Sequence, residues 1–245
     1  MTVTQAIVIV SAGLIAGIVN AMAGGGSLLT VALLTIFGDL PGLVANGTNR
    51  IGVAVQNSAS VAGYRRGGIS GLSRAISVLI PIIIGSIFGS LVVSSLTSES
   101  FERVFGVLML PILFLSLRPP KVSSVEITWR PVTTYVVFFA IGIYGGAFQA
   151  GVGLILVVAL ARSGLDLVNA NAVKVFVILV LTFFALPVFI IRNQVDWGFA
   201  AVLALGFALG GWIGARLAVR GGDKVIRPVL IISVVALALR MIGVF

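Results

Sequence analysis

The chain has 245 residues, of which 59% are hydrophobic and only 9% are charged, and its mean hydropathy is +1.22. A soluble domain needs roughly a quarter of its residues charged to wet its surface, so the composition excludes a soluble globular protein. The absence of cysteine and histidine excludes disulfide frameworks, thiolate nucleophiles, histidine-ligated metals and histidine acid/base catalysis, and makes an enzyme the least favoured class. The net charge of +9 comes from cations scattered singly between apolar runs, which argues against a nucleic-acid-binding protein.

Two stretches without charged side chains, residues 1–38 and 131–161, are too long for a single membrane crossing. As helices at ~1.5 Å per residue they would reach roughly 57 Å and 46 Å, against a hydrocarbon core of ~30 Å. Each contains a glycine cluster near its middle, at Ala23–Ser27 and at Ala150–Leu154, where helix propensity is lowest. We therefore predict that both segments are helices broken at these glycines.

Six further apolar windows each have the length of one tilted crossing: residues 45–64, 75–96, 101–117, 170–191, 198–219 and 225–244. The prediction is an all-α polytopic membrane protein of eight helical segments, two of them broken. The long polar interval Arg118–Arg130 contains a Pro-Pro pair and is predicted to be a cytoplasmic linker. We expect a first membrane repeat over residues 1–117, the linker over 118–131 and a second membrane repeat over 132–245.

The two halves of the chain match each other at a nearly constant spacing of 125 to 127 residues. The matches are, in chain order, Ala23–Gly26 with Ala150–Gly153, Ala45–Arg50 with Ala170–Val175, and Gly85 and Gly89 with Gly210 and Gly214. Ordered matches at one spacing indicate an internal duplication. The Gly-x-x-x-Gly pairs within these matches are interpreted as sites of close helix packing.

Lys and Arg accumulate in cytoplasmic loops, so the number of cations on each side of the membrane can be used to choose between two layouts. If each broken segment makes a full crossing, the halves run parallel, with eight cations inside and six outside. If the glycine clusters are the tips of re-entrant hairpins, each half has three crossings and the two repeats are inverted. Eleven cations are then inside, and only Arg103, Arg192 and Arg240 are outside. We expect the inverted layout with both termini outside.

Inverted repeats with broken helices are typical of secondary transporters, whose substrate site lies between the repeats. The second arms of the hairpins would point the positive ends of helices toward the centre, where an anion is favoured. Arg50 and Lys174 lie beside these arms, and an unpaired cation costs at least ~2.5 kcal/mol at the centre of a membrane helix. We predict that they supply positive field to an anion site. The alternatives are that they extend to the membrane interface or pair with Asp39 and Asp166.

The predicted anion site combines these cations with the amides of the glycine tips and with polar side chains that follow the tips. Its residues are Gly24, Gly25, Gly26, Ser27, Asn46, Thr48, Asn49 and Arg50 in the first half, and Gln149, Gly151, Gly153, Asn171 and Lys174 in the second. Gln56 and Asn57 are further candidates. For Gln149, Gln56 and Asn57, a hydrogen bond to a neighbouring helix is at least as good an interpretation.

The chain resembles the TauE/SafE sulfite exporter family along essentially its whole length. The resemblance is carried by Ala23–Ser27 after an apolar segment, by Ala45–Asn49 at the start of the next one, and by their echoes in the second half. It implies export of sulfite and small organosulfonates such as sulfoacetate across a bacterial inner membrane. It assigns Gly24–Gly26, Asn46, Thr48 and Asn49 to one half of the site, and Gly151, Gly153, Asn171 and Lys174 to the other. Val152 and Val173 depart from the first half's pattern, which has Gly25 and Thr48 at the matching positions.

The sequence thus predicts an alternating-access permease for small anions, with no cofactor and no metal. The alternatives are an anion channel and a non-transporting membrane scaffold subunit. The expected partners are the small anion and membrane lipid; a coupling proton and a second copy of the chain are further candidates, and no nucleic acid is expected. Proton coupling would require Asp39, Asp166 or Lys174, whereas a uniporter would be driven by the membrane potential, at ~2.3 kcal/mol per charge per 100 mV.

Overall fold

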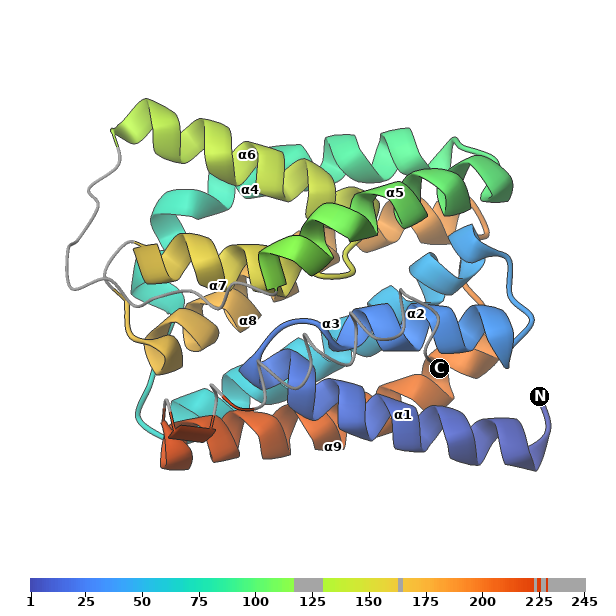
Figure 1. The fold of residues 1–245 in the computed structure, drawn as a ribbon, viewed down its shortest axis with the longest axis horizontal. Helices are drawn as coiled ribbons and strands as arrows, with labels where there is room; N and C mark the ends of the chain where they lie inside the picture. The colour runs from blue at the N-terminus through green and yellow to red at the C-terminus, as the bar shows by residue number, and fades with distance from the viewer. Residues whose placement is uncertain (117–129, 163–164, 223, 226–227, 229–245) are drawn as a thin grey trace.

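The structure is a computed structural model that describes residues 1–116, 130–162, 165–222, 224, 225 and 228. These residues form helices joined by short connections, with no strand among them (Figure 1). The helices are α1 Val3–Met22, α2 Gly26–Ile36, α3 Gly42–Arg66, α4 Leu72–Ser94, α5 Ser98–Ser116, α6 Pro131–Ala147, α7 Val152–Arg162, α8 Leu167–Ile191 and α9 Trp197–Gly221. The all-α prediction is confirmed for this part of the chain.

The predicted count of eight helical segments differs from the nine helices of the described residues. Each broken segment forms two separate helices, α1 with α2 and α6 with α7, which adds two helices, and the last predicted window adds none to the described helices. The predicted window 225–244 lies almost entirely outside the described residues, and so does the predicted linker, residues 118–131. The division of the chain into two repeats and a linker therefore stays a prediction.

Four of the described helices contain a stretch long and apolar enough to cross a membrane: α1, residues Ala75–Ser94 of α4, α8 and α9. The helices α2 and α6 are apolar but shorter, with 11 and 17 residues. The helix α3 has 25 residues, which is enough for a crossing, but it buries many polar side chains. These helices, together with the composition, make the chain an integral membrane protein.

The helices α1 and α2 form one hairpin, and α6 and α7 form a second. In Figure 1, α1 starts at the right-hand end of the bundle and α2 returns to that end, whereas α6 starts at the left-hand end and α7 returns to it. The chain leaves helical geometry at residues 23–25 in the first hairpin and at residues 148–151 in the second. The helices therefore break at both glycine clusters, as predicted, and the two tips approach each other from opposite ends.

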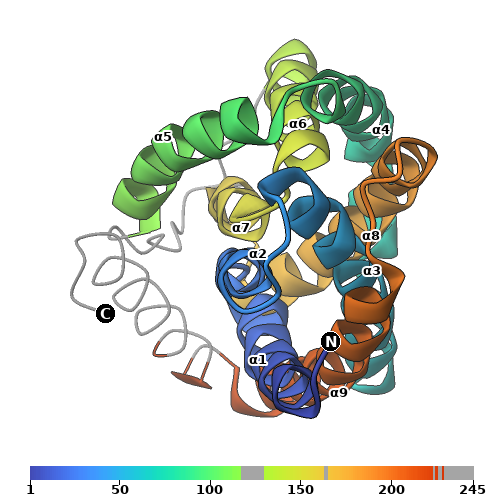
Figure 2. The ribbon, with the colours of Figure 1, turned by 90° about the vertical axis from the view of Figure 1, so that its right-hand side faces the viewer.

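Helices from different halves of the chain pack against each other. The helix α1 packs along α9 and α4 packs along α6, and Figure 2 shows the members of each pair side by side. Glycines allow this close approach, because a Cβ on Gly210 would overlap the carbonyl oxygen of Leu14, and a Cβ on Gly85 would overlap that of Phe139. The interpretation of the glycine pairs as packing sites is confirmed.

The helix boundaries follow the spacing of the sequence matches. The helix α3 begins at Gly42 and α8 begins 125 residues later at Leu167, and α4 and α9 begin at Leu72 and Trp197 with the same spacing. The second hairpin tip is one residue longer than the first, because it covers residues 148–151 where the first covers 23–25. This extra residue contributes to the wider spacing between the two glycine clusters.

Acidic residues start two helices of the second half. Asp166 accepts a hydrogen bond from the backbone N–H of Asn169 at 2.9 Å, and Asp196 accepts one from Phe199 N–H at 3.0 Å. Partial burial alone raises the pKa of the Asp166 carboxyl, but its hydrogen bonds with Asn169 outweigh this effect and hold the pKa below its ordinary value. These N-caps fix where α8 and α9 begin.

Candidate functional site

The two hairpin tips touch each other through backbone atoms. A Cβ built on Gly24 would lie 2.5 Å from the carbonyl carbon of Gly153, and one built on Gly153 would lie 2.6 Å from the Cα of Gly24. Gly24 also has a φ of +100°, a conformation that residues with a side chain rarely adopt. Both space and backbone conformation therefore require glycine here. Gly26 instead packs within its own hairpin, where a Cβ would overlap the carbonyl oxygen of Ala16.

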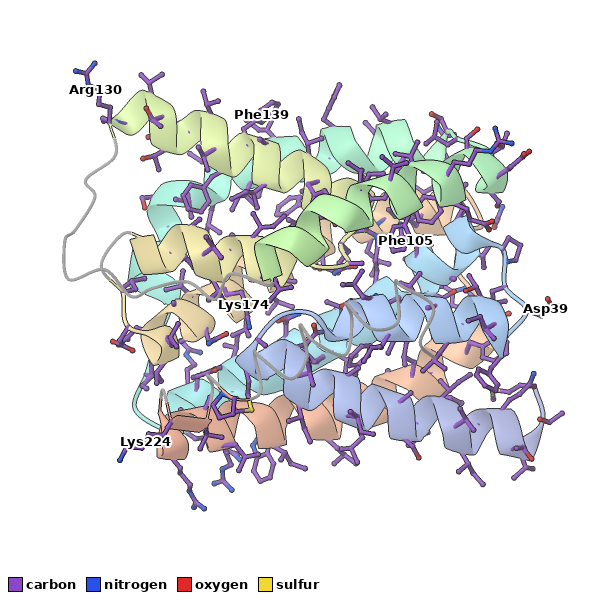
Figure 3. The ribbon with its side chains drawn as sticks, in the orientation of Figure 1. Asp39, Phe105, Arg130, Phe139, Lys174 and Lys224 are labelled. Atoms are coloured by element: carbon purple, nitrogen blue, oxygen red, sulfur yellow. The ribbon has the colours of Figure 1, made fainter. Side chains whose placement is uncertain are left out.

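Lys174 of α8 is fully buried and binds the C-terminal end of α1, in the other half of the chain. Its Nζ donates to the backbone oxygens of Asn20 at 2.7 Å and Ala21 at 3.2 Å, and to Oδ1 of Asn171 at 2.5 Å. Figure 3 shows Lys174 in the interior of the bundle. The hydroxyl of Tyr64 donates to the same Ala21 oxygen at 3.1 Å. Carbonyls in the last turn of a helix lack a donor within that helix, so these groups satisfy them.

Arg50 of α3 makes the corresponding contact with the second hairpin. Its Nη1 donates to the backbone oxygen of Gly145 at 3.2 Å, and its Nη2 donates to those of Gly146 at 2.6 Å and Ala147 at 2.9 Å. The guanidinium carbon lies 4.3 Å from the centre of the Phe189 ring, which is a cation–π contact. Arg50 is fully buried, like Lys174.

The two cations thus cap the broken helices of opposite halves. α1 ends at Met22 and α6 ends at Ala147, so each cation binds the last turn before a hairpin tip. A helix carries about half a negative charge at its C-terminus and about half a positive charge at its N-terminus. The cations more than neutralise the negative ends, and the positive ends of α2 and α7 begin just beyond the tips. The centre of the bundle therefore carries excess positive charge.

Neither alternative role of the two cations is found. Arg50 and Lys174 are fully buried against helix ends, so they do not extend to the membrane interface. Asp166 accepts hydrogen bonds from Asn169 at the start of α8. Asp39 lies at the right-hand end of the bundle in Figure 3, away from Lys174. The hydrogen-bond partners of the two cations are backbone carbonyls and, for Lys174, also the side-chain oxygen of Asn171.

A small cavity lies where the tips meet α3 and α8, with room for about one water molecule. It is lined by Asn20, Gly24, Ser27, Val53, Gln56, Asn57, Gln149, Val152, Gly153 and Ile178. Its polar side chains are four amides and one hydroxyl, and none of its lining residues is charged. Within the part of the chain that the structure describes, no group of three acidic side chains could hold a metal ion.

Two of the four amides, those of Asn20 and Gln149, form hydrogen bonds that connect the hairpin tips to neighbouring segments. Nδ2 of Asn20 donates to Oγ of Ser27 at 2.9 Å, and Oδ1 of Asn20 accepts from Ser27 N–H at 3.3 Å. This pair joins the end of α1 to the start of α2. Nε2 of Gln149 donates to Oγ1 of Thr182 at 2.7 Å, whereas its Oε1 is buried without a hydrogen-bond partner.

The helix α3 buries a run of polar side chains that reaches the cavity. These residues are Asn46, Thr48, Asn49, Arg50, Gln56, Asn57 and Ser60. From Asn46 to Ser60 they cover roughly 21 Å of helix, at ~1.5 Å per residue. Three of their buried atoms have no hydrogen-bond partner: Oδ1 of Asn46, Nδ2 of Asn49 and Nε of Arg50. In α8, counterparts 125 residues later include the apolar Leu181 and Ala185, so only the first half carries this polar run.

The structure brings the predicted site residues to three places. Gly24, Ser27, Gln149 and Gly153 line the cavity, Gly25 and Gly151 belong to the adjoining turns, and Gly26 begins α2. Arg50 and Lys174 lie at the helix ends with Asn46, which donates to Ala147 O at 2.9 Å, and Asn171.

Thr48 and Asn49 lie at contacts between helices. Oγ1 of Thr48 accepts from the backbone N–H of Asp196 at 2.9 Å, which joins α3 to the start of α9. Oδ1 of Asn49 accepts from Oγ1 of Thr30 at 2.6 Å, which joins α3 to α2.

Three residues of the site were missed by sequence reasoning: Asn20, Tyr64 and Thr182. Asn20 is a polar residue within an uncharged run, three residues before the glycine cluster, and this position was a usable signal. Thr182 lies 125 residues after Asn57, so the internal repeat pointed to it. Tyr64 had no such signal, because its partner is a backbone carbonyl of α1.

Comparison with known proteins places this arrangement in a family. The family model described as "Sulfite exporter TauE/SafE" matches residues 9–241. Similar curated proteins include "Probable membrane transporter protein ORF9" of Sinorhizobium sp, which is 29% identical over 95% of this chain and 90% of the relative. A "Probable membrane transporter protein" of Haemophilus influenzae is 27% identical over 94% and 91%, and "Probable membrane transporter protein YfcA" of Escherichia coli K12 is 27% identical over 89% and 82%. No solved structure matches the chain. Because the family model covers nearly the whole sequence, this chain belongs to the TauE/SafE family of membrane transporters.

Proposed function

We propose that this protein moves small anions across the bacterial inner membrane by alternating access. Sulfite and small organosulfonates such as sulfoacetate are the substrates of this proposal, and export is its direction. The family description and the names of the relatives support transport. The charge of the site supports an anion.

The observation that carries the proposal is the meeting of two hairpin tips beside two buried cations. Arg50 and Lys174 each outweigh the partial negative charge of the helix end that they bind. The positive ends of α2 and α7 add to the same field, and the cavity between them has no carboxylate in its lining. Positive charge in a low-dielectric interior strongly favours an anion, and oxygen atoms of a sulfite or sulfonate group suit amide and backbone N–H donors.

The placement of the charged ends supports the inverted layout. Arg130 and Lys224 lie at the same, left-hand end of the bundle in Figure 3, and Asp39 lies at the opposite end. In the parallel layout Arg130 and Lys224 would face opposite sides of the membrane. Because cytoplasmic loops accumulate Lys and Arg, the end with Arg130 and Lys224 is assigned to the cytoplasm.

The small size of the cavity favours a carrier over a channel. With room for about one water molecule, the cavity is too small to hold a sulfonate in this conformation. Substrate entry therefore requires the tips to move apart, as alternating access demands. An open anion channel would instead contain a continuous aqueous path.

Binding is tested by thermal melting of the purified protein with sulfite, sulfate, thiosulfate, sulfoacetate, taurine and acetate. Sulfite or sulfoacetate is expected to raise the melting temperature, because a ligand at 100 times its Kd stabilises the folded protein by ~2.7 kcal/mol. Failure of every anion to raise it would contradict the proposal and favour a scaffold subunit.

Transport is tested by uptake of labelled substrate into proteoliposomes. A carrier gives saturable uptake that is stimulated by unlabelled substrate on the other side of the membrane. Conductance that rises linearly with concentration would reject the carrier in favour of a channel. Applying a membrane potential, positive on the side toward which the anion moves, should accelerate the flux of a uniporter.

The layout is tested with single cysteines, because the natural chain has none. Lys224→Cys is expected to react with an impermeant maleimide only from the cytoplasmic side, and Asp39→Cys only from outside. Labelling of both positions from the same side would reject the inverted layout.

A further inference from the structure

We infer that Gln149 is the specificity-determining ligand of the anion, and that Arg50 and Lys174 are positioning residues that hold the hairpin tips without contacting it. The inference rests on the proposed function and divides the roles within that site. It follows from the backbone and hydrogen bonds of Gln149, from the asymmetry of the two halves, and from the bonds that the cations already make.

Gln149 occupies a strained position at the second tip. Its φ is +58°, in the left-handed region that non-glycine residues other than Asn and Asp rarely adopt. The neighbouring Gly151, with a φ of +78°, shows that glycine is used in the same turn. The first tip is one residue shorter, and its positive-φ residue is Gly24. A glutamine held at such a position, inside the bundle and only 2% exposed, indicates a use for its side chain.

The side chain of Gln149 lines the cavity with unused hydrogen-bonding capacity. Its Oε1 is buried without a partner, and its Nε2 makes one bond, to Oγ1 of Thr182. A buried unpartnered polar atom indicates a missing ligand or water. The threonine hydroxyl can donate as well as accept, so the amide can turn over and keep this bond. Gln149 can therefore offer N–H to an oxyanion, or its carbonyl to the hydroxyl of a protonated one.

The two halves contribute different groups to this cavity. The first half supplies Gln56 and Asn57 from the body of α3, whereas their counterparts in α8 are Leu181 and Thr182. The second half supplies Gln149 from its tip. The first half thus offers the anion amides from the body of α3 and, with Asn20, from the end of α1, whereas the second half offers the single amide of its tip.

Both buried cations already spend most of their donors on groups of the protein, and neither lines the cavity. An ammonium group has three N–H donors, and Lys174 makes three hydrogen bonds, so it has none left for an anion. The terminal nitrogens of Arg50 use three of the five guanidinium N–H donors on carbonyls at the end of α6, which leaves Nε–H and one N–H of Nη1. These cations act on the substrate through the placement of the tips and through their field.

The central experiment compares two glycine substitutions at positions with the same backbone conformation. Gln149→Gly removes the proposed ligand and accepts a φ of +58° without strain. Asn193→Gly is the matched control, because Asn193 has a φ of +53° but is exposed in the α8–α9 connection. We expect Gln149→Gly to weaken sulfite binding at least tenfold, the loss typical of a hydrogen bond to a charged group, and Asn193→Gly to leave it unchanged. Both variants should melt within about 3 °C of the natural protein.

Two further substitutions, Gln149→Asn and Gln149→Glu, test whether the amide group of this side chain binds the anion. Asparagine keeps an amide and tolerates the left-handed region, so it should recover part of the sulfite affinity that Gln149→Gly loses. Glutamate keeps the shape of the side chain but repels an anion, so it should bind sulfite more weakly than Gln149→Gly does.

The cations are tested by Arg50→Lys and Lys174→Arg, which keep the charge and change its geometry. As positioning residues they should leave the Kd for sulfite within threefold of the natural value and lower the transport rate at saturating sulfite at least tenfold. A direct ligand would show the reverse, a raised Kd with a smaller effect on the saturated rate.

The outcomes separate this inference from the proposed function. If the natural protein binds none of the anions, the proposed function fails and this inference fails with it. If the natural protein binds sulfite and Gln149→Gly binds it equally well, only the inference fails. A Kd raised more by Arg50→Lys or Lys174→Arg than by Gln149→Gly would also overturn it.

Discussion

Substitution of Gly24 by alanine separates the two hairpin tips. The new Cβ would lie 2.5 Å from the carbonyl carbon of Gly153, about 1 Å inside ordinary van der Waals contact. The neighbour is backbone, so no side chain can rotate to relieve the overlap. A left-handed backbone costs a residue with a side chain about 1–2 kcal/mol, and overpacking of this kind costs about 1–3 kcal/mol. The expected loss of stability is about 2–5 kcal/mol, which lowers the melting temperature by on the order of 10 °C.

The measurement is thermal melting of purified Gly24→Ala in detergent, with Gly25→Ala as its control. A Cβ on Gly25 would lie 3.6 Å from Cδ1 of Leu154, an ordinary contact, so Gly25→Ala should melt within about 2 °C of the natural protein. Because Gly24 and Gly153 share one contact, the variant with both changed to alanine should lose less than the sum of the single losses. Equal melting of Gly24→Ala and Gly25→Ala would refute the contact between the tips.

Three further substitutions test contacts around the site. Tyr64→Phe removes one of two donors to a carbonyl in the last turn of α1, and should cost only about 0.5–1.5 kcal/mol by thermal melting; a loss above 3 kcal/mol would contradict the shared capping. Asp166→Ala removes the N-cap of α8 and should cost about 1 kcal/mol at pH 7. Because the folded-state pKa of this carboxyl is lowered, the advantage of the natural residue is present at neutral pH and should shrink as the pH falls below about 4; an advantage that does not decrease at all as the solution is acidified would reject the assignment. Gly47→Ala drives a Cβ into the carbonyl oxygen of Gln194 and should melt well below Gly106→Ala, whose Cβ meets no atom within 4 Å; equal melting points would rule out the close packing of α3 on the α8–α9 connection.

The broken helices were predictable because they follow from length and local chemistry. An uncharged run longer than a crossing must break, and a glycine cluster marks the weakest point of the helix. In the structure the helices are interrupted within Asn20–Gly26 and within Ala147–Gly153, as this reasoning predicts. The partners of the breaks could not be found in the same way, because Lys174 lies 154 residues from Asn20 and Arg50 lies 96 residues from Gly146.

The internal repeat was informative about helices and less so about single side chains. At a spacing of 125 residues Lys174 matches Asn49, not Arg50, yet Arg50 is the residue that caps α6. Neighbouring residues on a helix point about 100° apart, so an alignment of halves does not decide which side chain reaches a given carbonyl. Thr48 illustrates the same limit, since it belongs to the polar run of α3 but bonds the start of α9.

Each half of the chain supplies the cation that caps a broken helix of the other half, and this affects how the protein folds during synthesis. During synthesis α1 enters the membrane long before α8 exists, and the bond from Lys174 to Asn20 spans 154 residues of chain. The end of α1 therefore lacks its bonds with Lys174 until the second half has been inserted. Bonds so distant in sequence make folding slow and strongly cooperative. Two halves produced as separate polypeptides would each carry a helix end without its cation and a buried cation without its carbonyls, and each would be stable only in the presence of the other.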